Sequence, residues 1–414
     1  MYNGTGAMVG RTWVIAPDID SLRNRWNALI SEADLTTKAT LFHPHLHDGK
    51  PGDKHINKAV KEQLGGSSDR TLSVANDTAT VIEPVRLGFR SFDRQWIIPD
   101  ARLINRPNPH LWKIFSDKQI YLTAPHDRTP TGGPALSFTS YIPDVHHYHG
   151  RGGRVFPLWY DAAATVPNMP VRLLTELSII YGRPVTGPDM FAYIAAVAAS
   201  PAYTERFRNQ LKQPGLRIPI CASRELFDTA VELGREVIWL HTFGERYTDG
   251  RPPGPPRVET DEPTIPSGGT LPSDSSEIPR ELEYDANLRR LKIGPGYIAN
   301  VSPKVWSYEV SGWNVVRQWW SYRRKDRSKP PMGDRRPPSK LSEIQPTVWQ
   351  PEYTTELLAL LRVLTRLVAL EPRQADLLVK IVNSPTTDSD ALRALGALGE
   401  ASADPPESQE DVTG

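Results

Sequence analysis

The chain has 414 residues, 39% hydrophobic and 23% charged, an ordinary globular mixture that can form a large core in roughly two or three domains. Lys and Arg number 49 against 48 Asp and Glu, which excludes a polycation that coats nucleic acid without specificity but allows a local basic face. Cys221 is the only cysteine, which excludes an internal disulfide and a cysteine-based zinc site and is typical of a reducing cytosol. With neither a signal peptide nor an apolar run of about 18 residues, we expect a soluble cytoplasmic protein without membrane contact.

Residues 1–85 are predicted to form a small connector segment. A strand is expected at 11–17, followed by a helix whose apolar residues recur at helical spacing over 22–30. Such a helix needs a side-chain acceptor at its first turn, and Asp18 or Asp20 can supply it.

Residues 86–170 are rich in short strands and turns, while residues 171–247 change to helical periodicity. The clearest strands read YLTAP, ALSFTSYIP and GGRVFPLWY, and Gly and Pro separate them. In the second region Pro201 is expected to interrupt the central helix. We therefore predict a strand-rich recognition region packed on a helical scaffold, which is an α+β fold.

The remaining chain divides into a loop, a mixed region and a tail. Residues 248–282 are dominated by Pro, Gly, Ser and acidic residues and are predicted to be a long, mobile loop. Residues 283–385 start with short strands and end in C-terminal helices, an amphipathic pair that we expect to be split at Pro372. Residues 386–414 are expected to be a flexible tail.

Several catalytic motifs are absent from the sequence. An amino-methyltransferase needs an Asp/Asn-Pro-Pro-aromatic tetrapeptide that holds the target amine, together with a Gly-rich cofactor loop, and the chain has neither. It also has no Walker A loop for ATP, no Gly-x-Ser-x-Gly elbow and no His-Glu-x-x-His zinc helix. We therefore expect no cofactor in this chain and no binding of S-adenosylmethionine by the chain alone.

Two histidine-rich segments raise the question of a metal site. Imidazole suits transition metals, and three ligands in one segment would favour binding. However, the histidines lie on irregular loops without an acidic or cysteine partner at a suitable offset. Polar or nucleic-acid contacts are therefore the favoured interpretation, and we predict no metal site. The histidines are His43, His45, His47, His146, His147 and His149.

A magnesium-dependent nuclease is an alternative hypothesis. Pro17-Asp18 with Asp48-Gly49-Lys50 resembles the loose PD…(D/E)xK pattern, in which two carboxylates hold Mg²⁺ and a lysine lies near the attacking water. The pattern is short and frequent by chance. It also needs two adjacent strands, whereas Asp18 is expected to open a helix.

Arginines interleaved with aromatic residues are the stronger signal. Arginine can bind O6 and N7 of guanine with two hydrogen bonds, or it can hold a phosphate. The alternative is that these arginines pair with carboxylates such as Asp93, Asp100 and Glu309, or lie on a solvated face. Both interpretations stay open for each single residue. The basic residues in question are Arg90, Arg94, Arg102, Arg106, Arg151, Arg154, Arg317, Arg323, Arg324, Lys325, Arg327, Lys329, Arg335 and Arg336.

The segment FRSFDRQWIIPDARLINRPNPHLW resembles the YRPFDxRWxxYDxxLxxRPR signature that opens the specificity half of type ISP restriction–modification enzymes and related adenine methyltransferases. RVFPLWYD, DMFAYIAAVAASPAYTERFRNQLKQPGLRIPI and VWSYEVSGWNVVRQWWSYRR follow in the order of the family, so that the resemblance covers roughly residues 86–385. Ser91 replaces a proline of the signature, and Asn108 replaces the second arginine of its RPR motif.

The resemblance implies a specificity module that binds double-stranded DNA and lacks catalytic residues of its own. The nuclease, helicase-like and methyltransferase parts would act in trans, and S-adenosylmethionine, ATP and Mg²⁺ would bind there. Whether the chain takes part in catalysis stays open, and an inactive remnant of a longer gene is a further alternative. The predicted DNA-binding residues are Arg90, Arg102, Asn105, Arg106, Arg151, Arg154, Arg323, Arg324 and Arg327.

Within the opening segment we expect the arginines to divide by role. Arg94 lies in the part most similar to the signature and should be structural, tied to a carboxylate and stacked near an aromatic ring. Arg102 and Arg106 lie in the turn-rich half, where loops reach outward from a scaffold, and should face DNA.

Overall fold

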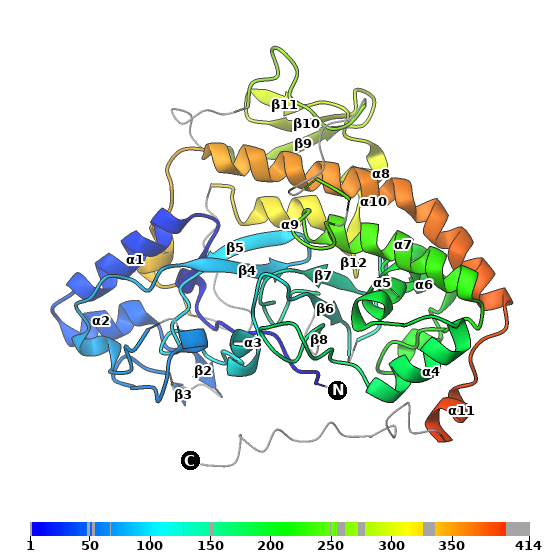
Figure 1. Ribbon diagram of the computed structural model, residues 1–414. Coiled ribbons are helices and arrows are strands. Elements are labelled where there is room, and N and C mark those ends of the chain that lie inside the picture. Colours follow the sequence, from blue (N-terminus) through cyan, green and yellow to red (C-terminus); the bar gives the residue numbers. More distant parts are fainter. Residues whose placement is uncertain are drawn as a thin grey trace.

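The computed structural model shows a body of helices and small antiparallel sheets, with the long helix α10 (Pro351–Asn383) across one side (Figure 1). The structure describes residues 2–47, 50–51, 54–66, 68–126, 128–148, 153–248, 250–252, 254, 261–271, 278–325 and 336–394. This mixture of helices and strands confirms the predicted α+β class.

The first sheet joins the N-terminal region to the opening segment. Its strands are β1 (Ile15–Ala16), β4 (Val85–Arg90) and β5 (Asp93–Ile97), in the antiparallel order β1–β5–β4. β1 is shorter than predicted because the residues before it form a 3-10 helix, Thr12–Val14. The β4–β5 turn places Phe92 in the left-handed region, with a φ of 64°.

The second sheet contains the three strands that the Gly- and Pro-punctuated pattern predicted. They are β6 (Tyr121–Ala124), β7 (Ser137–Thr139) and β8 (Arg154–Pro157), in the antiparallel order β7–β6–β8. All four residues of β6 are buried, since this strand lies between the two others.

Short helices and a small hairpin complete the N-terminal region. They are α1 (Ile19–Ser31), α2 (Leu35–Phe42), β2 (Leu46–His47), β3 (Lys50–Pro51) and α3 (Pro109–Lys113), with 3-10 helices at Leu64–Gly66 and Val74–Asn76. Asp18 accepts a hydrogen bond from the backbone N–H of Ser21 at 2.7 Å, which confirms it as the cap of α1.

The helical scaffold follows the second sheet in the chain. It contains α4 (Val171–Tyr181), α5 (Gly187–Ala198), α6 (Pro201–Arg206) and α7 (Arg224–His241), with a 3-10 helix at Gln210–Lys212. Pro201 opens α6 and separates it from α5, as predicted. A Cβ on Gly234 would overlap the carbonyl group of Ala192, so glycine is what allows α7 to pack closely on α5.

The last third of the chain contains a third sheet and the C-terminal helices. Its elements are β9 (Leu282–Asp285), β10 (Arg290–Ile293), β11 (Gly296–Ile298), α8 (Pro303–Trp306), β12 (Glu309–Val310), β13 (Trp313–Asn314), α9 (Val315–Ser321), α10 and α11 (Ser389–Ala394), with a 3-10 helix at Lys340–Glu343. β9, β10 and β11 form an antiparallel sheet that lies on the far side of α10 from the N terminus (Figure 1).

The prediction that the C-terminal helices are split at Pro372 is wrong, because α10 continues through this residue. Proline removes one backbone donor and normally kinks a helix. Here leucines before and after Pro372, such as Leu367 and Leu377, are buried in the same hydrophobic cluster. Packing along the whole helix stabilises it as one element and offsets the lost hydrogen bond.

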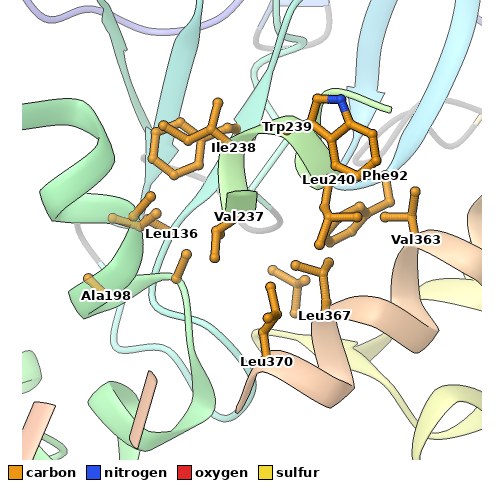
Figure 2. Packing of buried hydrophobic residues seen from close by; sticks show 14 of the residues in the cluster. Phe92, Leu136, Ala198, Val237, Ile238, Trp239, Leu240, Val363, Leu367 and Leu370 are labelled. Carbon is orange, nitrogen blue, oxygen red and sulfur yellow. The ribbon is translucent and has the colours of Figure 1, made fainter. Parts of the chain in front are cut away.

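Two hydrophobic clusters form the core. The larger one gathers side chains from the second sheet, the scaffold and α10, and Figure 2 shows Leu240 of α7 near Val363 and Leu367 of α10. The smaller one contains Trp13 and Trp26 together with Leu103 and other residues of the opening segment. Residues on both sides of position 85 therefore share one core.

Parts of the predicted loop and tail are packed against the body. The carboxylate of Glu262 is 2.9 Å from Nε of Arg366, and Thr264 pairs with Ala299. Leu392 of α11 is buried in the larger cluster. The stretches 255–260, 272–277 and 395–414 lie outside the described residues. Among the helices that the structure describes, none has the length and hydrophobicity that a membrane span requires.

Candidate nucleic-acid interface

The N-terminal residues form an extended segment between two other parts of the chain. Gly4 exchanges two backbone hydrogen bonds with Val155 of β8, at 3.1 and 2.7 Å, and Met8 exchanges two with Arg106, at 2.8 and 2.9 Å. A Cβ on Gly6 would lie 2.5 Å from the carbonyl oxygen of Pro143, so the segment passes too close for a side chain. We call residues 2–10, 105–110 and 154–157 the N-terminal ribbon.

Tyr2 links the two margins of the N-terminal ribbon. Its hydroxyl is 3.2 Å from Oδ1 of Asn108, and its ring lies 4.2 Å from the ring of His110, measured between centroids. Burial raises the pKa of Tyr2, while the hydrogen bond to Asn108 and the positive charge of Arg154 lower it. Arg154 therefore lies close enough to act electrostatically on the same hydroxyl.

Three predicted DNA-binding residues lie on the N-terminal ribbon. Arg106 is exposed, and Asn105 and Arg154 are half-buried. In the part of the chain that the structure describes, neither Arg106 nor Arg154 forms an ion pair within 4.0 Å. Gly10, with a φ of 73°, approaches Asn105 so closely that a side chain would meet the Asn105 Cβ. The ribbon thus presents two unpaired guanidinium groups beside an amide.

Arg90 and Arg94 in the β4–β5 hairpin are held by carboxylates. Nη1 of Arg90 lies 2.6 Å from Oδ1 of Asp144, and its guanidinium stacks 3.9 Å from the Phe89 ring centroid. Burial lowers the pKa of Arg90, but the charge of Asp144 and its hydrogen bond, together with the nearby Tyr322 and Asp93, offset this effect, so that the pKa lies above its ordinary value. Arg94 pairs with Glu245 at 3.0 Å and lies over an aromatic ring, so it has both contacts that we predicted for a structural role.

Arg102 is inside the protein, so the expectation that it faces outward does not hold. Its side chain is 2% exposed and contacts two carboxylates, that of Asp100 at 2.6 Å and that of Asp77 at 2.7 Å. A third acceptor, the carbonyl oxygen of Leu72, lies 2.9 Å from Nη1. The aspartate two residues before Arg102 also accepts its backbone N–H, which turns the side chain inward.

Arg323 is likewise buried, with an exposed side-chain fraction of 0%. Nη2 lies 2.9 Å from Asp93 and 3.0 Å from Glu356, and the guanidinium stacks 4.0 Å from the Trp319 ring centroid. Arg324, the next residue, lines a surface hollow beside β9 and lies apart from the N-terminal ribbon. Arg151 and Arg327 lie outside the described residues.

Those predicted histidine and nuclease residues that the structure describes are not assembled into a metal site. Within the described ranges, no group of three His, Cys, Asp or Glu side chains is arranged to hold a metal ion. His147 is buried, and its Nδ1 lies 2.8 Å from Oγ1 of Thr123. Asp18 caps α1 and accepts a hydrogen bond from Tyr353 at 3.0 Å. Asp48 lies outside the described residues, as does His149, and the side chain of Lys50 is not described.

The family model described as the type ISP C-terminal specificity domain matches residues 2–360. The chain belongs to this family. The match includes the first 85 residues, which we had placed outside the resemblance, and this agrees with the core that they share with the opening segment. None of the curated proteins matches the chain.

Solved structures share the fold of this type ISP specificity domain. With LlaBIII, an ATP-dependent type ISP restriction–modification enzyme bound to DNA, the TM-score is 0.58 at 14% identity, over 93% of this chain and 23% of that chain. With a nuclease-deletion mutant of the type ISP enzyme LlaGI in complex with a DNA substrate mimic, the TM-score is 0.52 at 17% identity, over 92% of this chain and 27% of that chain. With the DrdV–DNA complex the TM-score is 0.55 at 16% identity, over 93% of this chain and 36% of that chain. The chain thus spans about a quarter to a third of the length of these proteins.

The N terminus contributes to this specificity domain, which was not predicted from the sequence. Tyr2 and the three glycines of NGTGAMVG let an extended segment run between Arg106 and β8. Closely spaced glycines without a helical or strand pattern are a signal for close backbone approach. That signal could have been found, although nothing in it reveals which segments are approached.

Proposed function

We propose that this chain is a sequence-specific DNA-binding module of a type ISP-like restriction–modification system. Membership of the specificity-domain family supports this, and so do the similar solved structures, which are complexes with DNA or with a DNA substrate mimic. The observation that carries the proposal is that Arg106 and Arg154, on the two margins of the N-terminal ribbon, form no ion pair with any residue that the structure describes. Arginines that are buried in ion pairs with carboxylates inside the protein are not positioned to contact DNA.

In this proposal Arg106, Arg154 and Asn105 contact the duplex. Arginine can hold phosphates or read guanine with two hydrogen bonds, and asparagine can read adenine in the same way. A partner polypeptide supplies the methyltransferase and the helicase–nuclease parts, and it binds S-adenosylmethionine, ATP and Mg²⁺. Because the target is DNA, we place the module in the cytoplasm.

The test is a fluorescence-anisotropy titration with a duplex selected from a random pool. If about five phosphates are neutralised, log K should fall with log salt with a slope of roughly −4 to −5. Arg106→Gln or Arg154→Gln at a phosphate contact should weaken binding to all sequences and reduce the slope by about one. If the arginine contacts a base instead, the same change should weaken the binding free energy by about 1–3 kcal/mol, and only on the preferred sequence.

Lys380→Gln on α10 is the matched control, since it removes an exposed cation far along the chain from the N-terminal ribbon. This variant should bind like the wild type. A flat salt response, with both ribbon variants binding like the control, would contradict the proposal and favour an inactive remnant. Methylation of the selected duplex by a candidate partner, measured with and without this chain, then tests the assignment as a specificity module.

A further inference from the structure

A surface hollow of about 370 Å³ lies between α9 and the start of β9. On α9, the positions of Arg317, Ser321 and Arg324 follow the i, i+4, i+7 pattern, which places them along one stripe of the helix and its C-terminal turn. Arg323 points the other way, into the core. The residues that line the hollow are Arg280, Glu281, Leu282, Glu283, Arg317, Trp320, Ser321 and Arg324.

The arginines that line the hollow carry more N–H donors than the carboxylates and other acceptors of the hollow satisfy. Within the described part of the chain, Arg280, Arg317 and Arg324 form no ion pair within 4.0 Å. Nε of Arg324 is buried and has no hydrogen-bond partner there, which is costly unless a ligand or water supplies an acceptor.

The two glutamates at the rim do not neutralise these arginines. Glu283 lies 3.9 Å from Lys292 of the neighbouring strand, so its charge is already partly balanced. Ser321 donates its hydroxyl proton to the carbonyl oxygen of Gln318 at 2.8 Å, which leaves the arginines as the donors that face the hollow. Arg317 is held in place by stacking on Trp306, at 4.9 Å from the ring centroid.

We propose that this hollow binds a phosphate group through Arg280, Arg317 and Arg324. A phosphate offers several oxygen acceptors around one centre, and guanidinium groups match it with pairs of N–H donors. The group can come from a free nucleotide or from a nucleic-acid backbone, and both carry the same chemistry. The site is separate from the N-terminal ribbon, because none of its lining residues belongs to the ribbon and β9 lies on the far side of α10 from the N terminus (Figure 1).

The experiment is calorimetric titration of the full chain with inorganic pyrophosphate, together with duplex anisotropy. The double variant Arg317→Gln/Arg324→Gln should lower pyrophosphate affinity by at least about tenfold, since each arginine supplies charge-assisted hydrogen bonds. The matched control is Lys304→Gln/Lys380→Gln, which removes two exposed positive charges from helices outside the hollow. The control should bind pyrophosphate like the wild type.

The duplex arm identifies the source of the phosphate. If the double variant loses pyrophosphate binding only, the hollow serves a free phosphate or nucleotide; if duplex binding falls as well, it serves a nucleic-acid backbone. If the double variant binds both pyrophosphate and duplex DNA as tightly as its control does, the proposal is overturned. Arg106→Gln should leave pyrophosphate binding unchanged, so failure of the DNA-binding proposal and failure of this one give different results.

Discussion

The β4–β5 hairpin and the N-terminal ribbon use arginine in opposite ways. In the hairpin, Arg86 pairs with Glu356 at 2.9 Å and Arg94 pairs with Glu245 at 3.0 Å, and both partners come from distant parts of the chain. On the ribbon, Arg106 and Arg154 have no such partner among the described residues. The role of an arginine in this protein therefore depends on whether the fold brings a carboxylate to it.

The same difference governs what each group of arginines can do. A buried guanidinium needs a carboxylate and further acceptors, because its removal from water is costly. Once these contacts are made, the arginine holds segments together and is not accessible to a ligand. An exposed arginine avoids that cost and keeps its donors in solvent until a phosphate or a base replaces the water.

The largest effect is expected at Arg323, which is fully buried between Asp93 and Glu356. Arg323→Met leaves the buried carboxylate of Asp93 without its cation and removes one of the two arginines that pair with Glu356, so it should lower the free energy of unfolding by about 3–5 kcal/mol. Chemical denaturation measures the change. Arg324→Met is the neighbouring control and should cost less than about 1 kcal/mol. Equal effects of the two changes would show that burial does not separate their roles.

Acid should destabilise the protein through two buried histidines. Burial lowers the pKa of His241 and, together with the charges of Arg90 and His241, that of His147, each to about 3 from an ordinary 6.5. Below pH 6.5 the unfolded chain binds more protons than the folded chain. The stability that each group contributes is therefore complete above about pH 6.5 and is lost toward pH 3, by up to about 1.4 kcal/mol per pH unit.

Thermal melts between pH 8 and pH 4 test this dependence. His147→Gln keeps a polar partner for Thr123 and removes one titrating group, so its melting temperature should fall less steeply below about pH 6.5. Parallel curves for the variant and the wild type would mean that protonation of His147 does not limit acid stability. The result bears on the β4–β5 hairpin, because His147 is buried close enough to Arg90 to feel its charge.

A smaller effect is expected for Arg94, whose side chain is 22% exposed. Arg94→Ala removes the ion pair with Glu245 and the stacking on Phe243, and should cost about 1–2 kcal/mol. Arg94→Lys should recover part of this loss, because it keeps the charge. A melting temperature unchanged in Arg94→Ala, measured by circular dichroism, would place Arg94 with the ribbon arginines instead.

The smallest effect on stability is expected for Arg106 and Arg154. Arg106→Ala or Arg154→Ala should change the free energy of unfolding by no more than about 0.5 kcal/mol, because neither change leaves a described carboxylate without its cation. The same preparations should bind duplex DNA more weakly. Loss of stability without loss of DNA affinity would show that Arg106 and Arg154 have a structural role, like the arginines of the β4–β5 hairpin.

Local patterns determined much of what the sequence could predict. Three predicted features depend only on neighbours a few residues apart, so they could be predicted from the sequence. They are the cap at Asp18, the break at Pro201 and the short strands from β6 to β8. Several motifs in a fixed order identified the family before the fold was known. These features need no knowledge of which distant segments meet.

Only the tertiary structure decided the roles of the arginines. Arg102 lies in a turn-rich stretch, yet Asp77 and Asp100 bury it, and α10 continues through Pro372 because packing holds both halves. The N-terminal ribbon depends on Gly4 and Met8 meeting segments about a hundred or more residues away. The physical reason is that pairing and burial are set by contacts between distant segments, and composition and spacing carry no information on which carboxylate reaches which arginine.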